Sequence, residues 1–300
     1  MIYAAIEEKV RRPERIILSG RARPSGKRAY LIRKEPVLKR KISMLWREWR
    51  EAASRQDIEY IIQTGAVQQM LLDKWYAIAE AWLEDELQAE YQNAIQAAGN
   101  SLMEAYNRAR KSAAFNATTA AILNWMRGHG GELIRELTSG QALTINALLQ
   151  HQAFMGISNP AVLAQMLKPM IGLLRREALA VANYRAELIA AGLDRSKIEN
   201  RIEKYADFLL RARTERIART ELCYAFEFGQ MESIRQMQEA GLVSDVQKEW
   251  MTADDERMCP DCAALDGETV GLDEEFSGGV KAPPLHPGCR CDLGYSATRQ

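Results

Sequence analysis

Five side chains near the end of the chain have the types and the spacing of metal ligands. Cys259 and Cys262 are separated by two residues, and His286, Cys289 and Cys291 follow after 23 more residues. A Cys-x2-Cys pair places two thiolates on one tight turn, and zinc takes four nitrogen or sulfur ligands in a tetrahedron. The sequence therefore predicts a structural zinc site that uses Cys259, Cys262 and two of the three later candidates. The alternative is a compact tail whose reduced thiols bind nothing.

A catalytic site is not expected around these ligands. Catalytic zinc needs an open coordination position and a nearby general base, and four or five protein ligands leave no such position. Asp254, Asp255 and Glu256 precede the first cysteine and would suit a metal-dependent nuclease. Such a site usually also needs a second histidine, but His129 and His151 lie far away in helical sequence. The sequence also lacks a glycine-rich phosphate loop and a Gly-x-Ser-x-Gly motif. We therefore expect an interaction protein without catalytic residues. The alternative function is that of a zinc-containing DNA-binding or DNA-processing protein.

The positions of the cysteines also bear on the compartment. Four of the five cysteines lie in the last 42 residues, and clustered pairs in a chain that is not secreted indicate metal binding rather than disulfides. No apolar run reaches the ~18 residues of a membrane span. The first residues carry acids where a secretory signal would carry bases. We therefore expect a protein made and kept in a cytoplasm, with no membrane partner.

Charge is distributed unevenly along the 300 residues, although 40 basic and 40 acidic side chains balance overall. The first 50 residues contain 15 basic and 5 acidic residues, so they carry +10 and the rest of the chain carries −10. Residues 1–42 are predicted to be a basic arm for an anionic partner, either DNA or an acidic protein surface. The alternative is a solvated leader. No long helix is expected within 10–41, because glycine and proline recur there: Pro13, Gly20, Pro24, Gly26 and Pro36.

The elements that must position the candidate ligands are mostly helices. From about residue 43, apolar residues recur with the helical period. We predict a long helix over 67–95, a stop at 99–101, and a second helix over 102–125. The two helices would pack together as a hairpin within 43–130, followed by a break at 128–131.

The second half of the chain is predicted to be helical until its last part. A helical region over 131–210 includes a helix at 175–191, and another helix follows at 215–239. A strand is expected at 246–252 within a loop-rich unit, 211–300, that has little core of its own and needs a staple. The fold class is therefore mainly α, with a long helical hairpin and a helical bundle followed by a small zinc-stapled α+β unit.

Several motifs occur in one order in this part of the chain. They are Arg-Ile-Ala-Arg-Thr-Glu at 216–221, Trp-Met-Thr at 250–252, Asp-Glu-Arg-Met-Cys-Pro-Asp-Cys at 255–262, Leu-Asp-Gly at 265–267 and Pro-Pro-Leu-His-Pro-Gly-Cys-Arg-Cys at 283–291. Over roughly residues 170–293 the chain resembles the minor head protein family of tailed bacteriophages, with its Mu F-like head morphogenesis domain. One departure is Glu227-Phe228 before Gly229, where the family often has asparagine and a small residue.

This resemblance implies a structural minor head protein without enzymatic activity. Such a protein would act in head morphogenesis at or near the portal vertex and in DNA packaging or delivery. Its partners would be the portal protein, capsid proteins or both, and DNA would be a further partner of the basic N-terminal arm. The protein would belong to the virion, and to the host cytoplasm during assembly.

Overall fold

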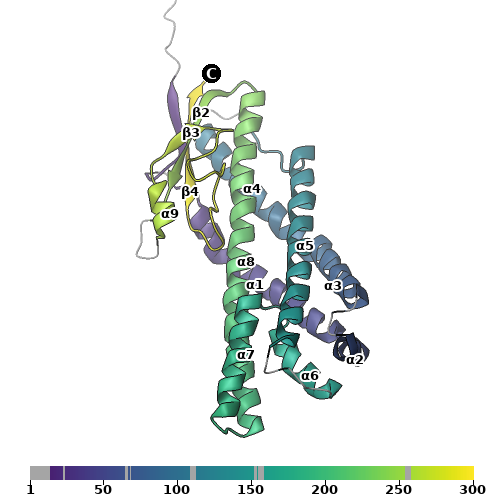
Figure 1. Cartoon of the computed structure of the whole chain (residues 1–300). Coiled ribbons are helices and arrows are strands. Elements are labelled where there is room, and N and C mark those ends of the chain that lie inside the picture. The colour runs from purple at the N-terminus through teal and green to yellow at the C-terminus, as the bar shows by residue number, and fades with distance from the viewer. Residues whose placement is uncertain are drawn as a thin grey trace, which may run out of the picture. The chain divides into compact units, whose positions relative to one another are not determined.

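The computed structural model describes residues 14–22, 24–64, 67, 69–108, 113–151, 154, 159–253 and 258–300 (Figure 1). These residues form a mainly helical protein with a small antiparallel sheet, as the sequence predicts for the coarse fold class. Within those ranges, no helix has both the length and the apolar character that crossing a bilayer requires.

The chain divides into two compact units that each combine separate stretches of sequence. Unit 1 comprises residues 1–29, 94–117 and 223–300, and unit 2 comprises residues 30–93 and 118–222. The four domains predicted from the sequence, 1–42, 43–130, 131–210 and 211–300, are continuous segments instead. That division of the chain stays a prediction.

Unit 1 contains the sheet, whose neighbouring strands are all antiparallel. In spatial order the strands are β1 (Arg15–Ser19), β4 (Asp292–Arg299), β2 (Val243–Met251) and β3 (Thr269–Gly271). The predicted strand is confirmed in β2, whereas β1 and β4 are additions to the prediction. One face of the sheet is buried and carries Trp250 of β2 with Leu293 and Tyr295 of β4.

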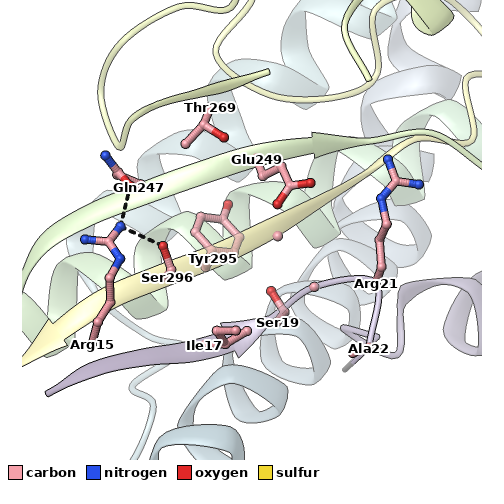
Figure 2. A pocket seen from close by; sticks show the side chains of 12 residues that line it. Arg15, Ile17, Ser19, Arg21, Ala22, Gln247, Glu249, Thr269, Tyr295 and Ser296 are labelled. Carbon is pink, nitrogen blue, oxygen red and sulfur yellow. Dashed lines mark hydrogen bonds between the residues drawn. The ribbon is translucent and has the colours of Figure 1, made fainter. Parts of the chain in front are cut away.

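The other face of the sheet is open to solvent and holds a shallow groove, shown in Figure 2. Arg15 of β1 reaches across β4, where it donates to Ser296 Oγ at 2.8 Å, and also donates to Gln247 Oε1 of β2 (Figure 2). Ile17 lies on the same face and is 60% exposed. Charged, polar and apolar side chains are mixed along this groove, so its lining favours no class of ligand.

Two helices complete unit 1 with their C-terminal parts, α4 (Gln88–Asn107) and α8 (Arg195–Glu239). They approach closely at Gly229, where an added Cβ atom would lie 2.6 Å from the backbone oxygen of Ile95. Four residues further along α8, Ser233 Oγ donates to the carbonyl of Gly99 at 3.1 Å. Only glycine allows this separation, which explains a glycine inside a long helix.

Gly229→Ala is therefore expected to destabilise unit 1 by about 1–3 kcal/mol, because the added methyl group meets backbone atoms that cannot rotate away. The matched control is Gly128→Ala in α5 (Ala120–Leu149), where an added Cβ would have no neighbour within 4 Å. That change is expected to stabilise the protein by up to about 1 kcal/mol, the difference in helix propensity. Urea denaturation measures both, and equal effects would contradict the close approach of α4 and α8.

All the regular elements among the described residues of unit 2 are helices. It contains α1 (Lys27–Ala52) from residue 30 onward, α2 (Arg55–Thr64), α3 (Gln69–Trp82), the π-helix η1 (Leu83–Leu87), the start of α4, α5, α6 (Pro160–Leu167), the 3-10 helix η2 (Lys168–Met170), α7 (Arg175–Ala190) and the start of α8. At its core, Trp49 and Trp75 stack with ring centroids 5.5 Å apart. Each indole N–H donates to the backbone oxygen of the other tryptophan, at 3.0 and 2.9 Å.

The prediction that residues 10–41 contain no long helix is wrong, because α1 begins at Lys27. Leu31, Leu38, Ile42 and Leu45 recur at helical spacing and are all buried, and their burial outweighs the local effect of Pro36. That proline lies in an exposed part of the helix, where water can satisfy the carbonyl that loses its hydrogen bond. The rest of the predicted arm consists of β1, of residues 14, 20–22 and 24–26 outside regular elements, and of residues outside the described ranges.

The predicted boundaries between 67 and 131 are also wrong. From residue 69 to residue 107, α3, η1 and α4 follow one another without a gap, and α5 then begins after its cap residue Thr119. Gly99 does not end the helix, because its missing side chain leaves room for the ring of Phe115. Gly130 is likewise inside α5, where an added Cβ would lie 2.3 Å from Leu83 Cδ1. These glycines permit close contacts instead of breaking helices.

Candidate metal centre

The first two candidate ligands lie at the start of a short helix, α9 (Pro260–Ala264). Cys259 precedes this helix in an extended conformation, and its Sγ accepts a hydrogen bond from the backbone N–H of Cys262 at 3.3 Å. Pro260 suits the first turn because its ring fixes φ and no N–H is needed there. The Cys-x2-Cys spacing therefore produces the predicted tight turn.

The other candidates lie on the loop that leads into β4. The backbone N–H of Cys289 donates to the carbonyl of His286 at 3.1 Å, and Gly288 between them has φ of 80°. This turn directs His286 and the two later cysteines toward α9. His286 Nε2 lies 3.1 Å from Cys259 Sγ and 3.3 Å from Cys262 Sγ, while its Nδ1 lies 3.2 Å from the carbonyl of Pro287. That outer contact orients the ring, as the second shell of a metal site does.

The structure brings all five predicted ligands together in two overlapping groups. Cys259, Cys262 and His286 form one group, Cys262, Cys289 and Cys291 form the other, and the ligand atoms of each group lie within 4.8 Å of one another. Cys262 belongs to both groups. Which four side chains would bind one ion stays a prediction.

These distances can be compared with those of a tetrahedral zinc site. Bonds of about 2.3 Å to sulfur and 2.0–2.1 Å to nitrogen place two sulfurs about 3.8 Å apart and a sulfur and a nitrogen about 3.6 Å apart. Cys262 Sγ and Cys289 Sγ are 3.7 Å apart, and the two sulfur–nitrogen distances are slightly shorter than the ideal. The spacings within each group of three are therefore close to those of a tetrahedral site, although no four of the five ligand atoms lie within 4.8 Å of one another.

The protonation of the thiols also favours a bound cation. Burial raises the pKa of Cys262 to about 12, whereas the hydrogen bond with Cys291 lowers the pKa of Cys289 to about 5. Ionisation is therefore easier at Cys289 than at Cys262, and the thiolate carries a negative charge. A divalent cation would compensate that charge and deprotonate its ligands, so metal uptake should release protons.

A buried ion pair beside the ligand loop was not predicted from the sequence. Lys27 Nζ lies 2.5 Å from Glu227 Oε1 and 2.5 Å from the carbonyl oxygen of Cys291, and both side chains of the pair are at most 3% exposed. Burial lowers the pKa of Lys27, but Cys223 and Glu227 outweigh it and raise the pKa above its usual value. Glu227, the departure from the family pattern, is therefore the partner of Lys27.

Other motif residues of unit 1 hold the region before the centre in place. Asp266 accepts hydrogen bonds from the backbone N–H and the hydroxyl of Thr252, both at 2.9 Å, and also pairs with Arg21. The next residue, Gly267, donates to the carbonyl of Trp250 at 2.9 Å. The Leu-Asp-Gly and Trp-Met-Thr segments are thus joined to each other by hydrogen bonds beside the sheet.

The Arg-Ile-Ala-Arg-Thr-Glu motif lies on α8 within unit 2 and forms ion pairs. Arg219 donates to both carboxylate oxygens of Glu35, at 2.8 and 2.9 Å. Arg216 pairs with Glu177 of α7 at 2.5 Å. These arginines therefore stabilise helix contacts within their unit.

The other two histidines of the chain are not part of this centre. His129 Nε2 lies 2.9 Å from Glu221 in unit 2, and His151 Nε2 lies 2.8 Å from Asn183 Oδ1. Residues 254–257, which include the acids of the nuclease alternative, lie outside the described ranges.

Comparison with protein families gives one match. Residues 179–294 match the family described as Phage Mu protein F like protein. The predicted resemblance over roughly 170–293 is thereby confirmed. Searches of curated proteins and of solved structures gave no match.

Proposed function

Residues 179–294 are a Mu F-like segment of this chain, and from that match we propose that the protein is a structural minor head protein of a tailed bacteriophage. Head morphogenesis is the function that the family match supports directly. The finer proposal is that the protein acts at or near the portal vertex and in DNA packaging or delivery. Its proposed partners are the portal protein, capsid proteins or both, with DNA as a partner of the basic N-terminal part, and its proposed location is the virion.

A role without catalysis is supported by the contacts of the motif side chains. Arg216 and Arg219 pair with carboxylates between helices, and Asp266 accepts two hydrogen bonds from Thr252. Residues committed to such contacts position other parts of the fold. A catalytic constellation would instead direct a nucleophile, a base and an electrostatic stabiliser to one accessible point.

We also propose that the Cys/His centre binds one zinc ion as a structural staple. Thiolate and imidazole are the donors that zinc prefers, and the donors of the centre come from the α9 turn and from the loop before β4. One ion would therefore connect two loop regions of unit 1 that are separate in sequence. In this role the ion contributes folding energy and performs no reaction.

The proposed function predicts that the chain is incorporated into phage heads. When the gene is deleted from the phage that encodes it, the yield of DNA-filled heads should fall sharply, and the chain supplied in trans should restore that yield. Quantitative mass spectrometry of gradient-purified heads should find the supplied chain at a fixed ratio to the portal protein. Heads that form and fill equally well without the chain, and never contain it, would refute the proposal.

The alternative, a zinc-containing DNA-processing protein, makes a different prediction in the same preparations. Purified chain would cleave DNA in a metal-dependent reaction, and Asp255→Ala would abolish that cleavage while the fold survives. The proposed structural protein has no such turnover to lose.

A further inference from the structure

The basic residues of α1 divide into two groups by their partners. Within unit 2, the three lysines of this helix all pair with carboxylates: Lys34 with Glu90 at 3.4 Å, Lys39 with Glu215 at 2.9 Å, and Lys41 with Glu86 and Glu90 at 2.9 Å each. Arg33, Arg40 and Arg47 are exposed, and none of them forms an ion pair with a carboxylate among the residues that the structure describes. The charges of these three lysines are therefore neutralised, and so is that of Arg50, which lies 4.0 Å from Asp207, whereas those of Arg33, Arg40 and Arg47 are not.

The three arginines lie along one side of the helix. Their spacing of seven residues places successive Cα atoms about 10.5 Å apart, so the stripe is about 21 Å long. Pro36 and Ser43 lie between them and are also exposed, and at 3.6 residues per turn all five positions fall within an arc of about 80°. We call these five residues the arginine stripe.

No free acid of the helix interrupts the stripe. Between Arg33 and Arg47 the only acidic residue is Glu35, which is half-buried and bound by both nitrogens of Arg219 at 2.8 and 2.9 Å. Glu48 and Glu51 follow the stripe in the last turn of α1. The stripe therefore presents a continuous positive surface that ends near Arg47.

We propose that the arginine stripe binds the phosphate backbone of double-stranded DNA without sequence preference. Guanidinium groups bind phosphate oxygens through two parallel hydrogen bonds. Duplex DNA carries one charge per about 1.7 Å of its axis, so a stripe of about 21 Å faces a dense row of phosphates. Small side chains between the arginines leave room for a sugar–phosphate backbone to approach the helix.

An acidic protein surface fits the stripe less well. Protein interfaces rely on large apolar or aromatic anchors at their centre, and the residues between the arginines are a proline and a serine. The exposed large apolar side chains beside this arc are at its edges: Ile32 is 68% exposed, and Met44 lines a separate groove together with Ala77, Ile78 and Trp82. The inference rests on the proposed function in one respect: a head protein meets packaged DNA at high concentration.

The test uses the full chain and a labelled 20-base-pair duplex of arbitrary sequence, with affinity measured by fluorescence anisotropy between 50 and 200 mM salt. The stripe variant is Arg33→Gln/Arg40→Gln/Arg47→Gln. The matched control is Arg175→Gln/Arg201→Gln/Arg211→Gln, which removes the same charge from exposed positions on α7 and α8. Circular dichroism confirms that both variants fold.

Loss of three phosphate contacts should reduce the slope of log affinity against log salt by about 2.7, at about 0.9 per contact. Over this fourfold salt range the unmodified chain should therefore lose about 40-fold more affinity than the stripe variant. The control variant should keep the slope of the unmodified chain.

Three results would overturn the inference. They are an equal slope reduction in both variants, no DNA binding by the unmodified chain at 50 mM salt, and a stripe variant that binds DNA normally but no longer binds the portal protein. The last result would assign the stripe to an acidic protein surface. Incorporation into heads is scored separately, so absence of the chain from heads refutes the proposed function and leaves the measured slopes to decide this inference.

Discussion

Replacing Cys262 by serine is expected to release the metal from the Cys/His centre and to unfold the sheet of unit 1. Cys262 is the residue that belongs to both ligand groups, so we expect it to bind the ion whichever group supplies the other ligands. Structural zinc contributes about 10–16 kcal/mol of apparent binding energy in small zinc-dependent folds, and folded domains are stable by only about 5–15 kcal/mol. Loss of the ion should therefore remove most or all of the stability of unit 1.

Two measurements check this expectation. Elemental analysis should give about one zinc ion per chain for the unmodified protein, since one tetrahedral centre holds one ion, and much less for Cys262→Ser. Hydrogen exchange of peptides that cover β2 and β4 should change from slow to fast in the variant, while peptides from α5 and α7 in unit 2 change little. This local readout separates loss of the centre from unfolding of the whole chain.

The control is Cys223→Ala, which removes a buried thiol of the same unit that is in neither ligand group. It should retain the metal and the slow exchange of β2 and β4, at a cost in stability of about 1 kcal/mol, as expected for a small core truncation. If freshly purified protein contains no metal, or if Cys262→Ser keeps both its exchange protection and its thermal transition, the zinc staple is wrong.

The candidate centre could be predicted from the sequence because its information is local. Two residues between Cys259 and Cys262, and two between His286 and Cys289, define turns whose geometry depends on few neighbours. β4 also had a readable signal that the prediction overlooked. Leu293, Tyr295 and Ala297 alternate with the small or polar residues Gly294, Ser296 and Thr298, and all three are buried.

Helix boundaries could not be predicted in the same way, because distant contacts override local preference. Gly130 has a low helix propensity, yet it lies inside α5 against Leu83, from a stretch of chain far away in sequence. Pro36 likewise lies inside α1, because buried Leu38 and Ile42 stabilise the helix around it. Glycine and proline show where a chain can bend, and only the packing decides whether it does.

Charge has the same limit. The excess of +10 in the first 50 residues predicted an arm with an anionic partner outside the protein. Part of that charge is compensated within the protein: Lys34, Lys39 and Lys41 have carboxylate partners within unit 2, and Lys27 has one within unit 1. These partners lie at least 45 residues away along the chain, so composition cannot distinguish paired lysines from unpaired arginines.

The pairing of Lys27 leads to the second large expected effect. Lys27→Met should destabilise unit 1 by about 3–5 kcal/mol, because removing one member of a buried ion pair leaves the other charge without compensation. The affected charge is Glu227, which is fully buried next to the strand that follows the ligand loop. Glu227→Leu should cost a similar amount for the converse reason.

The double variant Lys27→Met/Glu227→Leu distinguishes this explanation from a simple loss of packing. With both charges removed, the carbonyl of Cys291 loses its donor, at a cost of about 1–3 kcal/mol. The double variant should therefore be more stable than either single variant, whereas independent packing defects would add. Lys39→Met is the control, because Lys39 and Glu215 are 35% and 45% exposed and such a pair contributes less than about 1 kcal/mol.

Urea denaturation of the four variants and the unmodified chain, followed by hydrogen exchange of β2 and β4, gives the required free energies for unit 1. A double variant that is as unstable as the sum of the two single variants would show that charge compensation is not what Lys27 provides. A double variant that recovers stability but binds zinc more weakly would give Lys27 a second role, since its hydrogen bond to Cys291 orients the ligand loop. The lysine would then connect the first turn of α1 to the metal centre more than 200 residues later in the chain.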